Sequence, residues 1–254
     1  MVTQKSLQEI QIMRDAGRIV GQTLQYLGTL IKPGITTQYL DEEAEKFILA
    51  HHGIPEFKDY EGFPASICTS INDEVVHGVP SARKLEEGDI ISVDLGVRYN
   101  GYVGDSAKTF PVGTISPAAK KLLEVCEKSL YLGIEVAKIG NRISHIAERI
   151  QKYVESQGYS VVRDYTGHGI GRQMHEDPQV PNFVDKDLSD INFKLKAGHC
   201  IAIEPMVNIG TYRIKIVKRN GWEVVQTRDH QLSAHFEHSI AITEDGPQIL
   251  TLPD

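Results

Sequence analysis

An apolar segment that ends on a carboxylate occurs twice in this chain. Residues 85–94 (LEEGDIISVD) return 110 positions later as residues 195–204 (LKAGHCIAIE), with the same Leu, the same Gly and the same second Ile. Acidic residues are rarely buried, so an acid in the last position of both copies of an apolar strand indicates a site. A fold built from two copies of one unit would bring Asp94 and Glu204 to its midline, where facing carboxylates need a cation. The repeat therefore predicts a duplicated fold with a metal centre.

A second pair of matching segments extends the repeat. Residues 32–40 align with residues 138–146 at an offset of 106, and each opens an amphipathic helical pattern that runs into a Gly-marked break. A further helix is predicted before each copy, over about residues 6–31 and 117–137. The alternative is chance similarity of two helices and two strands. Two blocks in the same order, at nearly equal offsets, make chance the weaker interpretation.

The order of elements is thus helix, helix and strands, repeated once, with a boundary near residues 113–117. No low-complexity tract or flexible linker separates the copies. We predict one domain, residues 1–254, composed of two pseudo-repeat halves at about 1–115 and 116–254.

Charge and composition exclude several classes of protein. The net charge of −7 argues against a nucleic-acid-binding face, which is normally basic. No apolar run approaches the roughly 18 residues that a membrane span needs, and the N-terminus lacks the apolar core of a signal peptide. Cys68, Cys126 and Cys200 are far apart and form no CxxC pair, which fits free thiols in a reducing cytosol. We expect an acidic cytoplasmic protein without nucleic-acid or membrane partners.

Two carboxylates flank a predicted β-hairpin. Asn100 and Gly101 form the pair that is favoured in type I′ turns. With these residues in the turn, Asp94 faces Ala107, and Asp105 shares the sheet face of Asp94 as its diagonal neighbour. That separation suits two carboxylates that share a cation. The alternative is a pair of solvent-facing charges, which the apolar residues around them make weaker but leave open.

Glu237 is the counterpart of Asp105 in the second half, because each acid precedes a short β-like run that ends on a Gly. Together with Asp94 and Glu204, they would place four acids on one surface, where they repel one another without counter-charge. Two divalent ions would cancel the four charges. The pattern fits a dinuclear site.

The Gly-rich run 167–171 surrounds a histidine. It is a weak match to a nucleotide-binding loop, since Pro178 and Pro181 follow where a phosphate-binding helix should extend. Glycines on both sides of His168 would let the backbone approach a metal and leave the imidazole accessible. A lone His is more often structural, but beside four acids His168 is the natural nitrogen ligand. Four oxygen ligands and one imidazole suit Mn²⁺, Fe²⁺, Co²⁺ or Zn²⁺, and the lack of Cys ligands argues against structural zinc.

The segment from Tyr165 to Gly171, followed by His175 and then by Val180-Pro181-Asn182-Phe183, closely resembles the signature of type I methionine aminopeptidases. The order of the five predicted ligands matches the metal ligands of that family, and the resemblance covers essentially the whole chain. It implies the α+β "pita-bread" fold, in which helices pack on the outer face of a pseudo-twofold antiparallel sheet around a dinuclear metal site. It also implies metal-dependent removal of the N-terminal methionine from peptides and nascent proteins with a small second residue.

The resemblance assigns roles to individual residues. By spacing alone, His77 and His175 fit ordinary loop histidines and site residues equally well. In the family they match substrate-contacting histidines, His175 at the developing oxyanion and His77 at the substrate's peptide N–H, and Glu204 matches the residue that shuttles a proton. The implied metal ligands are Asp94 for one ion, His168 and Glu204 for the other, and Asp105 and Glu237 as bridges. The positions that match the methionine pocket are Tyr60, Phe63, Cys68, Met174 and Trp222.

Some positions depart from enterobacterial members of the family. Phe57 replaces a Cys, Phe63 a Tyr and Met174 a Phe. These changes concern the fine selectivity of the pocket and leave the predicted chemistry unchanged. Asn72 and Ser233 match the neighbourhood of a monovalent cation site in the family, so one such ion is expected there.

Lengths between motifs favour the type I assignment over its alternatives. Only 28 residues lie between His175 and Glu204, too few for the helical insertion of type II enzymes. No zinc-binding or ribosome-docking extension precedes Ser6, so we expect the short bacterial or organellar form, a monomer that acts on nascent polypeptides and on peptides with an N-terminal Met. The nearest alternative is a proline-specific aminopeptidase or dipeptidase, which usually carries a sizeable N-terminal domain. A catalytically inactive binding module is the other alternative, but such relatives lose metal ligands that this sequence keeps.

Overall fold

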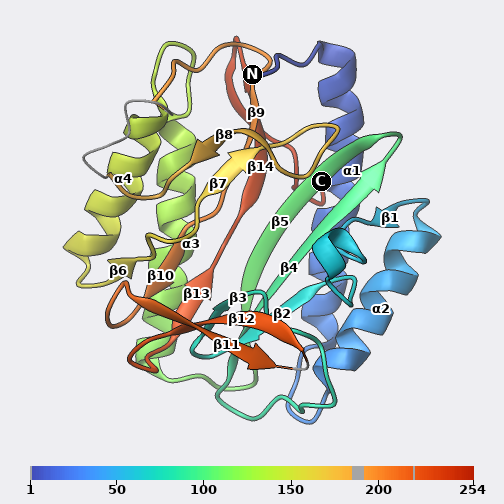
Figure 1. Ribbon diagram of the computed structural model, residues 1–254, viewed down its shortest axis with the longest axis vertical. Coiled ribbons are helices and arrows are strands. Elements are labelled where there is room, and N and C mark those ends of the chain that lie inside the picture. The colour runs from blue at the N-terminus through green and yellow to red at the C-terminus, as the bar shows by residue number, and fades with distance from the viewer. Residues whose placement is uncertain (1, 185–191, 220) are drawn as a thin grey trace.

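Two helices followed by antiparallel strands occur twice along the chain in the computed structural model, which describes residues 2–184, 192–219 and 221–254 (Figure 1). The elements of the first half are α1 (Leu7–Leu30), α2 (Thr37–Ala50), β1 (Ile54–Pro55), the 3₁₀ helix η1 (Tyr60–Gly62), β2 (Cys68–Ile71), β3 (Glu74–Val76), β4 (Ile90–Tyr99) and β5 (Tyr102–Pro111). Those of the second half are α3 (Pro117–Val136), α4 (Ile143–Ser156), β6 (Ser160–Val161), β7 (Gly167–Gly169), β8 (Glu176–Val180), β9 (Cys200–Ile203), β10 (Met206–Asn208), β11 (Ile214–Arg219), β12 (Trp222–Thr227), β13 (Ser233–His235), β14 (His238–Thr243) and β15 (Gly246–Ile249). Every strand pair of the described residues is antiparallel, so the predicted α+β class is confirmed.

The offsets of the sequence repeat recur in the structure. Helices α2 and α4 each have 14 residues and begin 106 positions apart. An isolated antiparallel bridge joins Thr36 to Lys84 in the first half, and a matching bridge joins Arg142 to Lys194 in the second. These partners are related by the same offsets, 106 and 110, that relate the two sequence copies. Equivalent residues of the repeat therefore make equivalent backbone contacts.

Local signals explain where the helices begin. Helix α1 starts after Ser6, whose hydroxyl accepts a hydrogen bond from the backbone N–H of Glu9, and α3 starts after Ser116 with Pro117 as its first residue. Both agree with the predicted ranges to within one residue at each end. The Thr36 hydroxyl caps α2 in the same way. No helix of the described segments combines the length and the apolar character that crossing a bilayer would require.

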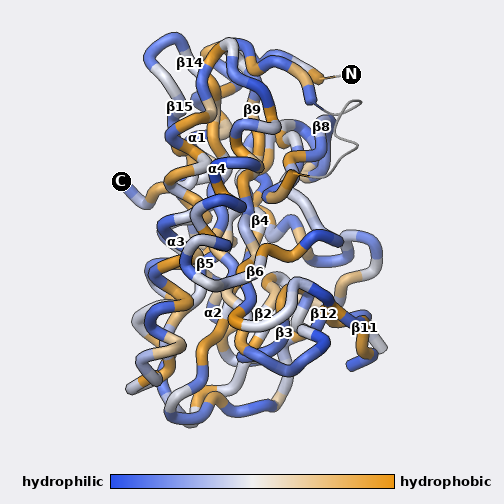
Figure 2. Tube along the Cα trace, turned by 90° about the vertical axis from the view of Figure 1, so that its left-hand side faces the viewer, coloured by the Kyte–Doolittle hydropathy of each residue, from blue (hydrophilic) through white to orange (hydrophobic). Residues whose placement is uncertain are grey.

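The helices form the outside of the molecule and the strands its centre. Helices α1 and α2 lie on one side in Figure 1, α3 and α4 on the other, and the strands run between them. The strands of the described segments form four hydrogen-bonded sheets, ordered β1-β4-β2 with β5 on β4, β13-β10-β6, β11-β12-β3 and β15-β14-β9-β7-β8. In the side view of Figure 2, the hairpin of β11 and β12 projects on the side opposite α3. The open face of the strands is thus left free of helices.

Each helix pair covers an apolar core of its own. In the first half Leu24, Ile48 and Leu95 belong to one buried cluster, and in the second half Leu130 and Ile150 belong to another. Burial of each such side chain contributes about 1.5–3 kcal/mol to stability. Each half therefore has a core under its own helices, and a third buried cluster contains residues of both halves and joins them.

The hairpin of β4 and β5 has the predicted register. Asp94 pairs with Ala107, and the turn residues Asn100 and Gly101 have φ values of 48° and 83°, as a type I′ turn requires. Asp105, two residues before Ala107, lies on the same face of the hairpin as Asp94. The diagonal carboxylate pair is therefore present as predicted.

Candidate metal centre and substrate pocket

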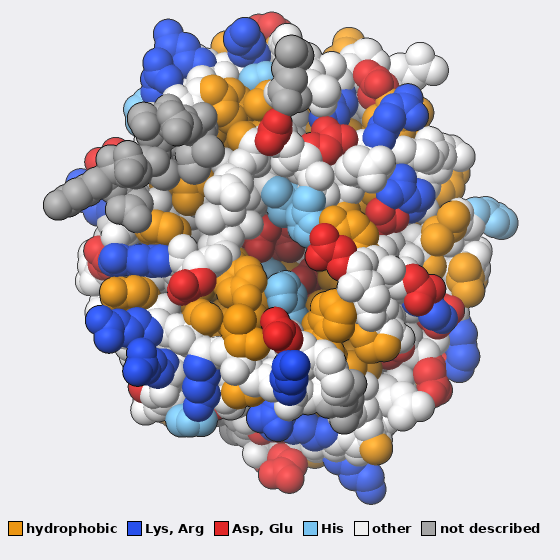
Figure 3. Space-filling view, in the orientation of Figure 1, with side chains coloured by type: hydrophobic (Ala, Val, Ile, Leu, Met, Phe, Trp, Pro, Cys, Tyr) orange, Lys and Arg blue, Asp and Glu red, His pale blue; other side chains and the backbone are white. Residues whose placement is uncertain are grey.

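A cavity of about 310 Å³ opens on the helix-free face, and residues from both halves line it. Figure 3 shows this hollow with acidic and histidine side chains at its floor and hydrophobic side chains along its rim. All twelve residues that the sequence predicts for the site line the cavity: Tyr60, Phe63, Cys68, His77, Asp94, Asp105, His168, Met174, His175, Glu204, Trp222 and Glu237. The fold thus brings together residues that are far apart in the sequence, such as Tyr60 and Glu237.

The four acids come from four different places in the sheets, two within strands and two next to strand ends. Asp94 lies in β4 and Asp105 in β5, whereas Glu204 directly follows β9 and Glu237 lies between β13 and β14. Asp105 and Glu237 are 3% and 2% exposed, so their charges are almost completely removed from water. Buried charges of one sign are stable only when something compensates them.

Hydrogen bonds between the halves hold Asp105 next to Glu237. The backbone N–H of Asp105 donates to Ser239 Oγ (3.1 Å), and the Ser239 hydroxyl donates back to the carbonyl of Asp105 (2.7 Å). The backbone N–H of Glu237 donates to the carbonyl of Ala107 (2.9 Å), and the Ser106 hydroxyl donates to the carbonyl of Glu237. The backbone around both carboxylates is therefore fixed by contacts that cross the midline.

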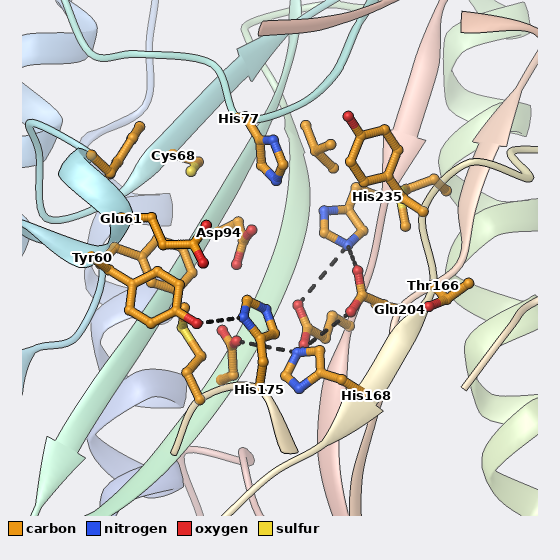
Figure 4. Close-up of a pocket in the computed structure, with 18 of the residues that line it drawn as sticks. Tyr60, Glu61, Cys68, His77, Asp94, Thr166, His168, His175, Glu204 and His235 are labelled. Atoms are coloured by element: carbon orange, nitrogen blue, oxygen red, sulfur yellow. Dashed lines mark hydrogen bonds and ion pairs between the residues drawn. The ribbon is translucent and has the colours of Figure 1, made fainter. Parts of the chain in front are cut away.

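His168 presents one ring nitrogen to the acids. Its Nδ1 lies 2.9 Å from the carbonyl of Gly169, and with Nδ1–H as the donor the lone pair of Nε2 is free. Nε2 lies 3.6 Å from Glu204 Oε1 and 3.8 Å from Asp105 Oδ2 (Figure 4). Burial, together with the smaller effect of the neighbouring His175, lowers the pKa of His168 to about 3, so the ring is neutral at physiological pH. A neutral imidazole with a backbone partner on its other nitrogen is the usual form of a metal-ligating histidine.

Burial, more than mutual repulsion, raises the pKa values of the four acids. Burial raises the pKa of Asp94 well above its usual range, and the charge of Asp105 adds to the effect. Burial also raises the pKa of Asp105 to about 7. For Glu204 and Glu237 burial is again the larger cause and the other carboxylates the smaller one, and both pKa values are well above normal. These shifts show a region of concentrated negative charge that favours binding of protons or cations.

The donor set fits divalent cations. Asp94 Oδ1, Asp105 Oδ1 and Glu237 Oε1 are buried without a hydrogen-bond partner among the described residues. Ligand atoms of Asp105, His168 and Glu237 all lie within 4.8 Å of one another. No Lys or Arg of the described chain lines the cavity to neutralise the acids. Oxygen-rich ligation with one imidazole suits first-row divalent ions, as the sequence predicts.

Apolar and aromatic side chains form the wall beside this floor. The rings of Phe63 and Trp222 meet edge to face with centroids 5.2 Å apart. The hydroxyl of Tyr60 lies 2.8 Å from Nδ1 of His175, whose ring is 4.4 Å from that of His168. The wall can therefore hold an apolar side chain while its polar groups face the carboxylates.

Several lining residues were missed in the sequence. They are Glu61, Val76, Met206 and His235, together with Tyr165 and Thr166 of the Gly-rich signature, which were not assigned to the site. Met206 lies two residues after Glu204, and His235 two residues before Glu237. Residues two apart in an extended segment lie on the same face. This spacing from Glu204 and Glu237 is the sequence signal that could have identified Met206 and His235.

Asn72 and Ser233, predicted near a monovalent cation, lie outside the residues that line the cavity. The backbone N–H of Ser233 donates to the carbonyl of Asn72 (2.9 Å), and the side-chain amide of Asn72 donates to Asp89 (2.8 Å). Ser233 Oγ is buried and has no hydrogen-bond partner among the described residues. The two residues are thus neighbours, and Ser233 Oγ is the oxygen that could bind a cation there.

Comparison with known proteins agrees with this geometry. Residues 11–244 match metallopeptidase family M24. The chain is 55% identical to a methionine aminopeptidase of Clostridium acetobutylicum over 99% of both chains. It is 53% identical to methionine aminopeptidase 1 of Bacillus subtilis, again over 99% of both.

Solved structures place the fold in the same group. The crystal structure of methionine aminopeptidase from Rickettsia prowazekii superposes with a TM-score of 0.95 at 40% identity, covering 99% of this chain and 100% of that one. Prolidase from Pyrococcus furiosus, at 21% identity and a TM-score of 0.76, shares the fold over 66% of its own length. The chain belongs to metallopeptidase family M24 and, within it, to the methionine aminopeptidases.

Proposed function

We propose that the chain hydrolyses the peptide bond after an N-terminal methionine, in peptides and nascent polypeptides with a small second residue, using two divalent ions. The observation that supports this best is the cavity floor, where four buried carboxylates and one neutral imidazole meet an apolar wall. Asp94 would serve one ion, His168 with Glu204 the other, and Asp105 with Glu237 would bridge them. Fe²⁺, Mn²⁺, Co²⁺ and Zn²⁺ are the candidates. Bound divalent ions supply a Lewis acid and lower the pKa of water from 15.7 to about 7.

Protein side chains would bind the substrate and move protons. Glu204 is suited to carry a proton to the leaving amine, because burial raises its pKa above the usual range of a carboxyl and its side chain, 13% exposed, faces the cavity. With the Tyr60 hydroxyl donating to Nδ1 of His175, Nε2 of His175 carries a proton that can be donated to a developing oxyanion. His77, whose burial lowers its pKa to about 4, is neutral and can accept the substrate's peptide N–H.

The remaining parts of the proposal concern the molecule as a whole. We propose a single catalytic domain, residues 1–254, with halves at about 1–115 and 116–254, which the matched backbone bridges support. We further propose that it works as a cytoplasmic monomer. The uncommitted Ser233 hydroxyl beside the Asn72 carbonyl supports a monovalent cation there.

A peptide panel tests the substrate assignment. Tyr60, Phe63, Cys68, Met174 and Trp222 would hold the flexible methionine side chain, because its thioether packs well against rings and thiols. We expect Met-Ala-Ser to be cleaved far faster than peptides starting with Ala or Lys. Norleucine should remain usable, since such a pocket separates near-isosteres by only about 1–3 kcal/mol per methylene. Cleavage of any Xaa-Pro peptide with indifference to Met would assign the chain to the proline-specific alternative.

Chelation followed by addition of single metals tests the metal requirement. Hydrolysis of Met-Ala-Ser should cease after chelation and return when Fe²⁺, Mn²⁺, Co²⁺ or Zn²⁺ is added. Because burial raises the pKa of Asp105 from 3.8 to about 7, the folded metal-free protein keeps a proton that the unfolded chain releases. Its stability should therefore fall as the pH rises through this interval. The gain in melting temperature on adding metal should be larger at about pH 8 than at about pH 5, and an equal gain at both would contradict this reading.

A further inference from the structure

His235 is a buried histidine on the cavity floor with no hydrogen-bond partner for either ring nitrogen among the described residues. It is 1% exposed and was not among the predicted site residues. Its Nε2 lies 3.9 Å from Glu204 Oε2 and 3.9 Å from Glu237 Oε2, so the ring faces both carboxylates at once (Figure 4). Buried polar atoms are nearly always satisfied, so a ring with two unsatisfied nitrogens beside two acids requires an explanation.

The backbone of His235 is fixed by strands of both halves. Its N–H donates to Thr109 Oγ1 (2.9 Å), and the Thr109 hydroxyl is positioned to donate to its carbonyl (2.8 Å). Thr109 is in turn 2.8 Å from the hydroxyl of Ser92, and His235 pairs with Met206 across strands β13 and β10. These contacts fix the point from which the His235 ring extends toward the carboxylates.

The direction of the ring decides its tautomer. A neutral imidazole has one N–H donor and one lone pair. A lone pair on Nε2 would point at the oxygens of Glu204 and Glu237 and repel them, whereas an N–H there attracts both. No other side chain or backbone group of the described residues donates a hydrogen bond to either carboxylate; the contacts of Asn182 and Ser106 reach only the backbone carbonyls of Glu204 and Glu237. His235 is therefore the available donor to these two acids.

We propose that His235 is a positioning residue whose Nε2–H donates to the carboxylates of Glu204 and Glu237, orienting them for the ion that Glu204 and His168 would hold. This rests on the metal ligands named in the proposed function and not on the identity of the substrate. The distance of 3.9 Å from His235 Nε2 to Glu204 Oε2 is longer than a hydrogen bond by about 1 Å. Catalytic hydrogen bonds commonly shorten by such amounts in the complex with substrate. A direct ligand role fits less well. Nδ1 of His168 has a carbonyl partner that orients a ligating imidazole, and Nδ1 of His235 has none.

Three substitutions separate the possibilities. In His235→Gln the amide nitrogen takes the place of Nε2 and keeps the donor, whereas His235→Asn places its amide near Nδ1, and His235→Ala removes both. By titration calorimetry with Co²⁺ or Mn²⁺, we expect His235→Ala and His235→Asn to weaken binding of one of the two ions by about 10–100-fold. His235→Gln should bind both ions with an affinity close to that of the wild type. For Met-Ala-Ser, His235→Ala and His235→Asn should lower kcat more than they raise KM, and His235→Gln should keep kcat close to that of the wild type. His77→Ala is the matched control for metal binding, since this histidine lines the same cavity and, among the described residues, the ion pairs with the site carboxylates are made by His168 and His235.

Unchanged metal affinity and kcat in His235→Ala would overturn the proposal. A second result would also overturn it. If His235→Gln binds metal as weakly as His235→Ala, and X-ray absorption of the Co²⁺-loaded wild type shows two imidazole ligands, then His235 is itself a ligand. One imidazole per dinuclear site supports the donor role. If the Ala variant does not fold, the comparison of Gln with Asn and the wild-type absorption spectrum still decide the question. Absence of Met-Ala-Ser hydrolysis by the wild type would refute the proposed function alone, since the calorimetric comparison does not depend on it.

Discussion

Asp105→Ala is expected to abolish hydrolysis of Met-Ala-Ser and to weaken binding of both divalent ions. Asp105 is 3% exposed at the centre of the floor, and its carboxylate faces the Nε2 of His168 at 3.8 Å. As the proposed bridge, it has no substitute in the described part of the cavity. Glu237→Ala should behave alike, because Glu237 is equally buried and hydrogen-bonded to the same strand. Calorimetry with Co²⁺ or Mn²⁺ and steady-state assays measure both effects.

Two comparisons make this result specific. His168→Ala should weaken one ion more than the other, because His168 is proposed to serve a single ion. The chelated Asp105→Ala protein should melt no lower than chelated wild type near neutral pH, because the substitution removes one of four mutually repelling acids. Two tightly bound ions and near-normal turnover in Asp105→Ala would show that the bridging assignment is wrong.

His175→Ala should lower kcat by about 10²–10³-fold, the usual effect of removing one donor to an oxyanion. Burial lowers the pKa of His175, so the neutral ring depends on its partner to set which nitrogen carries the proton. Tyr60, 2.8 Å from Nδ1, is that partner, and Tyr60→Phe should cause a smaller loss of kcat. The measurement is kcat and KM for Met-Ala-Ser with each purified variant.

Stability separates this role from a structural one. His175 lies between β7 and β8, is partly exposed to solvent at the cavity, and is not proposed as a metal ligand. The melting temperature of His175→Ala should therefore stay close to that of the wild type. A variant with intact kcat and a strongly lowered melting temperature would make His175 a residue of the loop's structure rather than of the reaction.

Local features of this chain could be read from sequence alone. The capping residue Ser6, the N-terminal Pro117 of α3 and the turn Asn100-Gly101 act through neighbours a few residues away. Their predicted consequences, two helix starts and the hairpin register that puts Asp105 beside Asp94, are present in the structure. The duplication could also be recognised in the sequence, because two copies that make equivalent contacts keep a similar pattern of apolar and turn residues.

What the tertiary structure decided is how the two copies meet. Asp105 and Glu237 are held together by hydrogen bonds between Ser239 and Asp105 and between Glu237 and Ala107, partners more than a hundred positions apart. No local propensity or spacing specifies such contacts, because they depend on how the two halves pack against each other. The same packing buries the acids and turns His235 toward them. A pattern of residues could therefore name the carboxylates, but only the packed molecule sets their distances, their charge state and the histidine that faces them.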